Sequence, residues 1–362
     1  MLAGCISKWT PDVESGELLR QQQLQLRQQQ QHSFCDEVTD KVQPSMLIED
    51  EVHGVIQLPS HIQELVDHRL FQRLRKVNQL GLLPLAAKPE GTHTRYDHCI
   101  GTYKSAKDQL NCLKRNSTYE PALPVWCRHA VEIAALLHDI GHGPFSHNWE
   151  QVCGKSFDHE QNGLTCVDQI FADVKNPALI SLRDDKSGRG VQLIKALIIG
   201  DRELLTYPMM GHGYIFDIVH NNRCGLDVDK WDYIRRDNNR LHVLSADEMD
   251  FNEVFEQARI SPDGQRIEYR YDDYHRIYKL YVARWRLHVS AYQLPKALAF
   301  DNLLAKIVRR SQPNLTNIRA DSTGDAWLEL VDDKVLHLIA GYPLTPYLLK
   351  PERWIEIPSC SG

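Results

Sequence analysis

The sequence HDIGHGPFSH occupies residues 138–147 and places His138, Asp139, His142 and His147 within one short stretch. Two glycines and a proline separate these side chains, and glycine lets a backbone or a phosphate approach closely. Imidazole and carboxylate groups are ligands for borderline divalent metals. The stretch therefore predicts a metal site that acts on a phosphate.

Helical periodicity surrounds this stretch. The residues that follow His138 and Asp139 include Gly141 and Pro144, which break helices, so the pair is expected at a helix end. A short strand is expected over 265–271, after the turn Pro262-Asp263-Gly264. Apolar residues recur at helical spacing in two segments: Ile62, Leu65, Val66, Leu70, Leu74 and Val77, and Trp126, Ala130, Ile133, Ala134 and Leu137.

Three further motifs strengthen the metal interpretation, because a lone His-Asp pair usually marks only a helix end. They are RYDH (95–98), DHE (158–160) and GLDVDKWDY (225–233). Two i, i+4, i+8 series would each line one helix face, although such spacing is equally typical of a solvated face. The two series are Asp229, Tyr233 and Asp237, and Arg284, His288 and Tyr292.

The bulk composition limits the function classes. With 42 basic and 48 acidic residues the net charge is −6, which gives no general attraction to nucleic acid or to anionic membranes. No apolar run approaches the roughly 20 residues that span a bilayer. Nine cysteines without a C-x-x-C pair fit a reduced protein, which we expect inside the cell, in the nucleus or cytoplasm.

The chain divides by composition into three parts. Residues 1–45 contain QQQLQLRQQQQH (21–32) and are predicted to be a disordered Gln-rich tail. Residues 46–345 are predicted to form the folded phosphohydrolase domain, and residues 346–362 a C-terminal tail.

The motifs resemble the HD-domain superfamily, and within it the deoxynucleoside triphosphate triphosphohydrolases typified by the sterile-alpha-motif and HD-domain-containing protein. The resemblance runs from Ile48 to Lys296 through VHGVIQL, FQRLRKVNQLG, TRYDHCIGT, LLHDIGHGPFSH, DHEQ, GLDVDKWDY and AYQ. It implies a mainly α fold, an HD-domain helical bundle with a small β-hairpin arm. It also implies a homo-oligomer, dimer or tetramer, that hydrolyses deoxynucleoside triphosphates to deoxynucleoside and inorganic triphosphate.

The resemblance also implies the catalytic groups. The metal would be iron, with zinc or manganese as alternatives, and magnesium would bind at the substrate phosphates. His147 is the expected general acid for the leaving 5′ oxygen, while His142 and His159 would contact the α-phosphate region and tune that donor. Glu150 stands where the family has aspartate, which could lower activity. The implied metal ligands are His98, His138, Asp139 and Asp229.

Substrate and regulatory residues follow from the same resemblance. The phosphate clamp would be Arg95, Lys230 and Arg284; the sugar pocket Gln79, Leu80, Tyr233 and Asp237; and further base and sugar contacts Tyr292 and Gln293. Asp67, Gln72 and Arg75 match positions of a regulatory guanine-nucleotide site, but Met46, Glu49, Val55, Ser290 and Pro295 replace its other contacts. With no sterile-alpha-motif domain and little of the family's C-terminal region among the 362 residues, weak or different regulation is expected.

Two alternatives remain at this level. An HD nucleotidase or phosphodiesterase would keep the metal and take another nucleotide, since one fold supports several phosphoester reactions. A catalytically dead binding protein would hold nucleotides or, weakly, single-stranded nucleic acid through the pairs Arg235-Arg236 and Arg309-Arg310.

Overall fold

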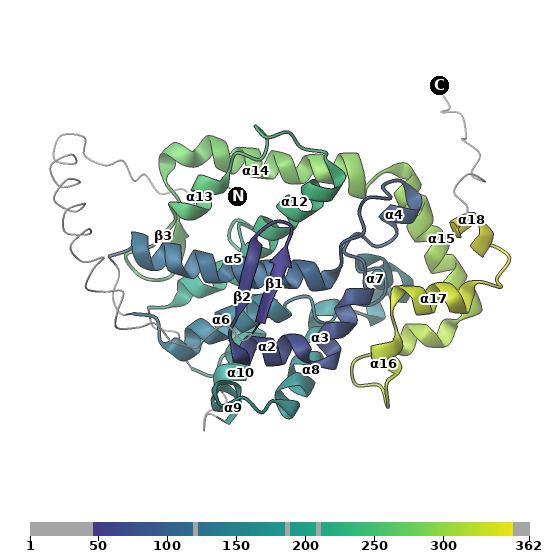
Figure 1. Ribbon diagram of the computed structural model, residues 1–362, viewed down its shortest axis with the longest axis horizontal. Helices are drawn as coiled ribbons and strands as arrows, with labels where there is room; N and C mark the ends of the chain where they lie inside the picture. Colours follow the sequence, from purple (N-terminus) through teal and green to yellow (C-terminus); the bar gives the residue numbers. More distant parts are fainter. Residues whose placement is uncertain (1–45, 119–121, 185–188, 208–210, 350–362) are drawn as a thin grey trace.

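Helices make up nearly all of the regular structure in the computed structural model, which describes residues 46–118, 122–184, 189–207 and 211–349 (Figure 1). The mainly α fold class is therefore confirmed. The predicted N-terminal tail lies outside the described residues. Helix α18 (Thr345–Leu349) contains the buried Leu348, and residues 350–362 lie outside the described residues.

The helices follow one another with short connections. In chain order the α-helices are α2 (Ser60–Asp67), α3 (Arg69–Arg73), α4 (Leu83–Ala86), α5 (Arg95–Asn116), α6 (Val125–Leu137), α7 (His147–Cys153), α8 (His159–Asp173), α9 (Pro177–Asp184), α10 (Arg189–Ile199), α11 (Phe216–Val219), α12 (Val228–Leu241), α13 (Asn252–Glu256), α14 (Tyr274–Leu287), α15 (Pro295–Ser311), α16 (Ala326–Glu329), α17 (Asp332–Ile339) and α18. Among them, none combines the length and the apolarity needed to cross a lipid bilayer.

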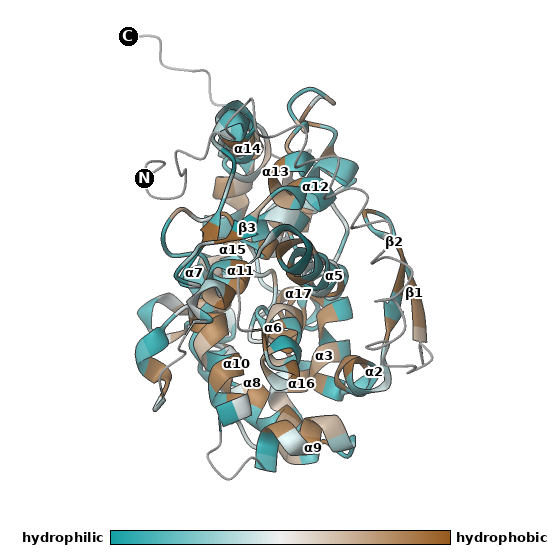
Figure 2. Ribbon diagram, turned by 90° about the vertical axis from the view of Figure 1, so that its left-hand side faces the viewer, coloured by the Kyte–Doolittle hydropathy of each residue, from teal (hydrophilic) through white to brown (hydrophobic). Residues whose placement is uncertain are grey.

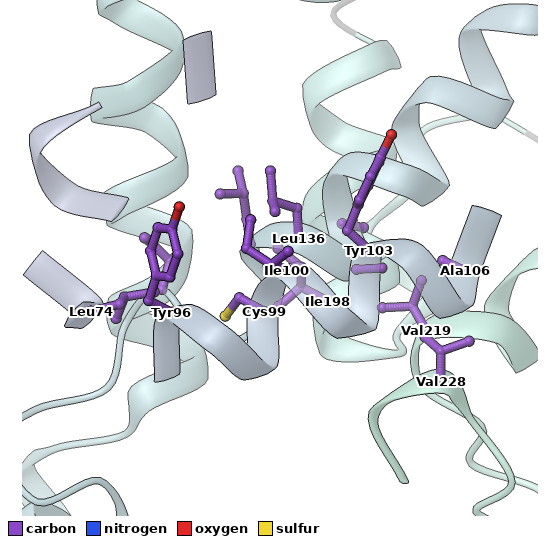
Figure 3. Packing of buried hydrophobic residues seen from close by; sticks show 14 of the residues in the cluster. Leu74, Tyr96, Cys99, Ile100, Tyr103, Ala106, Leu136, Ile198, Val219 and Val228 are labelled. Atoms are coloured by element: carbon purple, nitrogen blue, oxygen red, sulfur yellow. The ribbon is translucent and has the colours of Figure 1, made fainter. Parts of the chain in front are cut away.

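Helix α5 runs through the middle of the core, packed between α6 and α12. Its residues Tyr96, Ile100 and Tyr103 are buried at spacings of 4 and 3, which places them on one helix face. Figure 3 shows these residues in one cluster of buried hydrophobic side chains that also contains Leu136 of α6 and Val228 of α12. Because α5, α6 and α12 are held by one core, polar residues at their ends are brought close together.

The helix predicted across 62–77 is interrupted, and this corrects the sequence interpretation. Helix α2 ends at Asp67, and His68 takes an extended backbone with ψ 137° before α3 begins. The side chain of His68 accepts a hydrogen bond from the Leu70 amide, which caps the new helix. The predicted apolar residues are still buried, because the break at His68 is only one residue long and Leu70 and Leu74 after it still face the core.

Two antiparallel hairpins accompany the helices. The predicted arm exists as β3 (Arg259–Ile260) and β4 (Ile267–Glu268), but it is shorter than expected, since Tyr271 already begins a 3₁₀ turn. The other hairpin, β1 (Met46–Asp50) and β2 (Gly54–Leu58), was not predicted. Figure 2 shows it at one edge of the molecule, outside α5.

Candidate active site

Four side chains from three helix ends converge on one point. His98 lies in the first turn of α5, His138 and Asp139 follow α6, and Asp229 lies in the first turn of α12. The Nε2 atoms of His98 and His138 are 3.2 Å apart, and Oδ1 of Asp229 is 3.0 and 3.6 Å from them. Oδ2 of Asp139 lies 3.5 Å from His98 Nε2 and 3.3 Å from His138 Nε2.

This geometry fits a metal ion. With metal–ligand bonds of about 2.0–2.2 Å, donor atoms around one ion lie about 3–3.5 Å apart. Two imidazole nitrogens and two carboxylate oxygens form a donor set suited to a borderline transition ion. The structure thus brings together all four residues named from the sequence as metal ligands.

Both histidines are held with Nε2 toward this point. The Nδ1 atom of His138 lies 2.9 Å from the Ala135 carbonyl oxygen, and Nδ1 of His98 lies 2.8 Å from Oδ2 of Asp232. Such bonds fix the tautomer that leaves Nε2 available for a metal. Asp232 was missed by the sequence analysis, although its place three residues after Asp229 on a predicted helix was a usable signal.

Asp232 is itself tightly surrounded. Its other oxygen lies 2.7 Å from Nε2 of His53, in the turn between β1 and β2, and Arg236 donates to both carboxylate oxygens. A Cβ on Gly101 would lie 1.9 Å from Oδ1 of Asp232, so only glycine lets α5 and α12 approach this closely. The unpredicted hairpin therefore supports the orientation of a metal ligand.

The carboxylates of the centre are held ionised. Burial opposes charge on Asp139, but Arg95 and His138 outweigh it and keep its pKa well below the usual value. Burial likewise opposes charge on Asp229, and hydrogen bonds from His138 and His98 keep its pKa low. Two anionic oxygens are thus presented to a cation at neutral pH.

A second cluster, the histidine group, consists of His142, His147, His159 and Glu150. The rings of His142 and His159 stack with centroids 4.0 Å apart, and the ring of His147 stands at 89° to that of His142. Glu150 bridges the group, with Oε1 2.5 Å from Nδ1 of His159 and Oε2 3.2 Å from Nδ1 of His147. Its longer side chain therefore reaches both rings.

The buried ring of His142 and the half-buried ring of His159 have pKa values shifted in opposite directions. Burial lowers the pKa of His159, but the hydrogen bond that its Nδ1–H donates to Glu150, with the negative charges of Asp139 and Glu150, outweighs burial, and the net shift is upward. Burial and the nearby Arg95 push the pKa of His142 well below its ordinary value. His159 thus favours the charged form and His142 the neutral one.

The histidine group is poorly arranged to hold a metal of its own, although its nitrogens lie within 4.8 Å of one another. Imidazole lone pairs lie in the ring plane, and the planes of His142 and His159 differ by only 10° while the rings stack. Two stacked rings cannot direct their lone pairs at one ion. The cluster is better suited to proton transfer.

A close approach between two backbones builds the histidine group. A Cβ on Gly141 would lie 2.1 Å from the His159 carbonyl oxygen, so glycine is required for α8 to begin beside the HDIGHGPFSH segment. Asn162 of α8 donates to the Gly141 carbonyl at 2.9 Å and fixes this contact.

A cavity of about 530 Å³ opens beside both clusters, within the usual range for small-molecule sites. His138, Asp139 and Asp229 line it, together with these residues named as substrate or catalytic groups: Gln79, Leu80, Arg95, His147, His159, Lys230, Tyr233, Asp237, Arg284 and Tyr292. His98, His142 and Glu150 lie behind them. The cavity also contains Asn148 and Asp301, which the sequence analysis missed.

Gln293 is not brought to the cavity, which corrects that prediction. The chain makes a π-helical turn at η7 (His288–Tyr292), and Gln293 comes directly after it with an exposed side chain. Its amide donates to the His288 carbonyl at 2.8 Å and ends the helix. The π turn changes the helical register at this point, and Gln293 is not among the residues that line the cavity.

The residues named for a regulatory nucleotide gather elsewhere, around Tyr96. The Arg75 guanidinium lies 3.5 Å from the ring centroid of Tyr96, and its Nε donates to Gln72 at 2.9 Å. Asp67 is exposed at the end of α2 and accepts from Gln63. These side chains are close neighbours but do not line the cavity.

Polar groups inside the cavity are largely engaged. Asp237 accepts from the Tyr292 hydroxyl and lies 2.7 Å from Nε2 of His93. Nζ of Lys230 is 3.0 Å from both oxygens of Asp227. By contrast, Oε1 of the buried Gln79 has no hydrogen-bond partner among the described residues. A buried acceptor of this kind is ready to meet a donor from a ligand.

One member of each arginine pair named for nucleic-acid binding is engaged within the fold. Arg236 is 2% exposed and is bound by Asp232 and Asp50. Arg309 donates to the carbonyl oxygens of Val152 and Gln151. The other members of these pairs are Arg235, which is half-buried, and Arg310, which is exposed.

Comparison with known proteins agrees with the motifs. Residues 95–189 match the family model of the HD domain. The deoxynucleoside triphosphate triphosphohydrolase SAMHD1 homolog of Dictyostelium discoideum is 31% identical over 265 residues, covering 71% of this chain and 48% of that protein. The putative HD domain-containing protein L394 of Acanthamoeba polyphaga mimivirus is 28% identical over 329 residues, covering 86% and 69%.

Human deoxynucleoside triphosphate triphosphohydrolase SAMHD1 is 29% identical over 268 residues, covering 68% of this chain and 41% of the human protein. The chain spans about half the length of most of the curated relatives that it matches. The resemblance predicted from the sequence is confirmed: this chain carries an HD domain and has deoxynucleoside triphosphate triphosphohydrolases among its homologues.

Proposed function

We propose that this HD-domain chain is a metal-dependent phosphohydrolase that converts deoxynucleoside triphosphates to deoxynucleoside and inorganic triphosphate. One observation carries the proposal: the four converging metal donors open onto the same cavity as the histidine group and the residues named for phosphate and sugar. The names of the relatives in Dictyostelium and human support the same substrate class.

The metal end of the cavity would activate water. His98, His138, Asp139 and Asp229 would hold one transition ion, iron first and zinc or manganese as alternatives. When bound, such an ion lowers the pKa of water and neutralises charge on a phosphoryl oxygen. The chain's own contribution is to aim two Nε2 atoms and two carboxylates at one point, with the Ala135 carbonyl and Asp232 behind the histidines.

Magnesium is part of the proposal because most of the cationic side chains expected to bind the phosphates are already paired with carboxylates. Arg95 lines the cavity but is paired with Asp139, and Lys230 is paired with Asp227. Arg284 donates to the Tyr233 hydroxyl at 3.1 Å and forms no ion pair among the described residues. Because a triphosphate brings several negative charges into a partly desolvated site, one uncommitted guanidinium leaves most of that charge to metal ions.

The histidine group would supply the proton. Hydrolysis breaks the bond between the α-phosphorus and the 5′ oxygen, and water provides the new oxygen on phosphorus. The departing 5′ oxygen must gain a proton, and His147 lines the cavity with its Nδ1 held by Glu150. The charged form of His159, favoured by Glu150, can restore the protonated state of this group.

The sugar end is formed by Gln79, Tyr233 and Asp237. The unsatisfied Oε1 of Gln79 would accept from the 3′-hydroxyl, and Tyr233 would occupy the space of a 2′-hydroxyl. Because ribose and deoxyribose both carry a 3′-hydroxyl, Gln79 would bind either sugar. The choice of deoxyribose in this proposal therefore depends on Tyr233 filling the space of the 2′-hydroxyl.

Product identity tests the proposal. The purified full chain is incubated with each dNTP and each rNTP in the presence of iron, manganese, zinc and magnesium, and the products are separated by ion-exchange chromatography. Inorganic triphosphate with deoxynucleoside is the expected result. Pyrophosphate or orthophosphate as the only inorganic product would instead indicate another HD phosphohydrolase, and no turnover with any metal would contradict enzymatic function.

A further inference from the structure

The loop that carries the histidine group contains strained backbone. Phe145 and Ser146 both have φ of 56°, a left-handed conformation that non-glycine residues avoid, and Ser146 has ψ of −126°. Such residues keep this conformation only when the surrounding structure imposes it. Since His142 precedes them and His147 comes next in the chain, whatever imposes the conformation also sets the histidine geometry.

A carboxylate from a distant part of the chain holds this loop. Asp332, at the start of α17, accepts a hydrogen bond from the Phe145 amide at 2.7 Å through Oδ1. Its other oxygen accepts from the Asn78 amide at 2.9 Å. The Ser146 hydroxyl donates to the Asn78 carbonyl at 2.6 Å, so both strained residues are tied to the segment that also presents Gln79 to the cavity.

A second tie runs through Arg73 in α3, which is 4% exposed. Its Nη1 donates to the His142 carbonyl at 2.8 Å. The remaining guanidinium donors go to the carbonyls of Trp327 at 2.9 Å and Leu330 at 2.6 Å. The planar fork of arginine makes these bonds simultaneously and joins the HDIGHGPFSH segment to the chain just before Asp332.

The connection continues to the metal centre. The Ser146 hydroxyl accepts from Nε of Arg95 at 2.9 Å, and Arg95 is ion-paired with Asp139. An unbroken series of hydrogen bonds thus leads from Asp332, through Asn78 and Ser146, to a metal ligand. Arg73 and Asp332 both lie outside the residues that match the HD domain, 95–189.

We propose that Asp332 is a positioning residue for catalysis: with Arg73, it holds the strained 142–147 loop in the conformation that aims His142 and His147. The kinetic part of this inference rests on the proposed function, whereas the statement about loop conformation does not.

The test substitutes Asp332→Asn in the full chain. The asparagine amide has one acceptor oxygen where aspartate has two, and its NH₂ group would face a backbone N–H. One of the two hydrogen bonds to the Phe145 and Asn78 amides is therefore lost, while the side-chain volume hardly changes. Asp333→Asn is the matched control, because Asp333 is exposed and lies in the same first turn of α17.

Two readouts are taken for each variant. Hydrogen–deuterium exchange measured by mass spectrometry is expected to rise in peptides covering 141–149 in Asp332→Asn alone. With dNTP as substrate, kcat is expected to fall by about 10- to 100-fold, the scale of a small misplacement of catalytic groups. Bound metal should change little, because no metal ligand is substituted.

The outcomes separate cleanly. Exchange and kcat equal to those of Asp333→Asn would overturn the proposal. So would faster exchange spread evenly over the whole chain, since that result indicates a general loss of stability. If the unmodified protein hydrolyses no dNTP, the proposed function fails, but the local exchange at 141–149 still decides whether Asp332 holds the loop.

Discussion

Nδ1 of His98 lies 2.8 Å from Oδ2 of Asp232, so a carboxylate that touches no substrate decides how a metal-directed imidazole is oriented. The same carboxylate is bound by His53 of the β1–β2 turn and by Arg236. The candidate metal centre is therefore connected to the β1–β2 hairpin through Asp232. The affinity for metal can be tested by substituting Asp232, which is not itself one of the four candidate ligands.

Asp232→Asn should weaken metal binding by about 10- to 100-fold, the usual cost of losing a partner behind a ligating histidine. The measurement is metal content and affinity of the purified protein. Asp237→Asn is the matched change on the same helix: it should raise KM for dNTP while leaving metal affinity as in the unmodified protein. Equal metal affinity in all three proteins would show that Asp232 does not orient His98.

His138→Ala and Asp139→Ala should lose both metal and turnover, because each removes a donor atom from the coordination shell. His147→Ala should keep its metal, since its ring is outside that shell, and should lose about 10²–10⁴ in kcat as expected for a general acid. Metal analysis beside steady-state kinetics distinguishes the two classes. Undiminished turnover in His147→Ala would remove it from the mechanism.

Glu150→Gln should change stability in a pH-dependent way. Glu150 has its pKa lowered from 4.5, so its contribution is present above about 4.5 and is lost as the pH falls through the lowered value. His159 has its pKa raised from 6.5, so its contribution is complete below about 6.5 and is lost as the pH rises through the raised value.

The difference in Tm between the unmodified protein and Glu150→Gln should accordingly be largest between about pH 4.5 and 6.5 and should shrink on either side. Thermal unfolding across this range is the measurement. The same substitution made in a His159→Gln background should lose most of this pH dependence. A difference that does not vary with pH would mean that the two groups are not coupled.

Gly141→Ala should cost about 1–3 kcal/mol in the free energy of unfolding, the usual penalty of overpacking, because the new Cβ would lie 2.1 Å from the His159 carbonyl oxygen. It should also lower kcat by displacing His159. Gly341→Ala is the control, since a Cβ there meets no atom within 4 Å. Chemical denaturation compares the two, and similar stabilities would refute the close approach as the reason for glycine.

Hydrolysis by the purified protein should proceed without GTP or a second activating nucleotide. Met46, Glu49 and Val55 replace regulatory contacts expected from the family resemblance, and they lie on β1 and β2, where Val55 is 58% exposed. Turnover of single dNTPs with and without added GTP is the measurement. Strict dependence on GTP would contradict this prediction.

The sequence by itself indicated the donor types of the site and several of the helices that carry them. Helix α6 follows the apolar spacing of 126–137, and α12 presents Asp229, Tyr233 and Asp237 on the cavity side, because a 3.6-residue period is local and needs no tertiary information. Likewise HDIGHGPFSH indicates ligands by residue type. The sequence could not show which groups fix the orientation of the His98 and His138 rings by hydrogen bonds.

Only the tertiary structure decided the supports of the site. Asp232, Asp332 and Arg73 act across long sequence separations, through hydrogen bonds that leave no periodic trace in the chain. Gln293 was misplaced because a π turn adds a residue that spacing alone does not reveal. The residue type alone gives the kind of donor atom that a side chain offers to a metal. The orientation of that side chain depends on hydrogen bonds from segments that are distant in the sequence and that the core brings together.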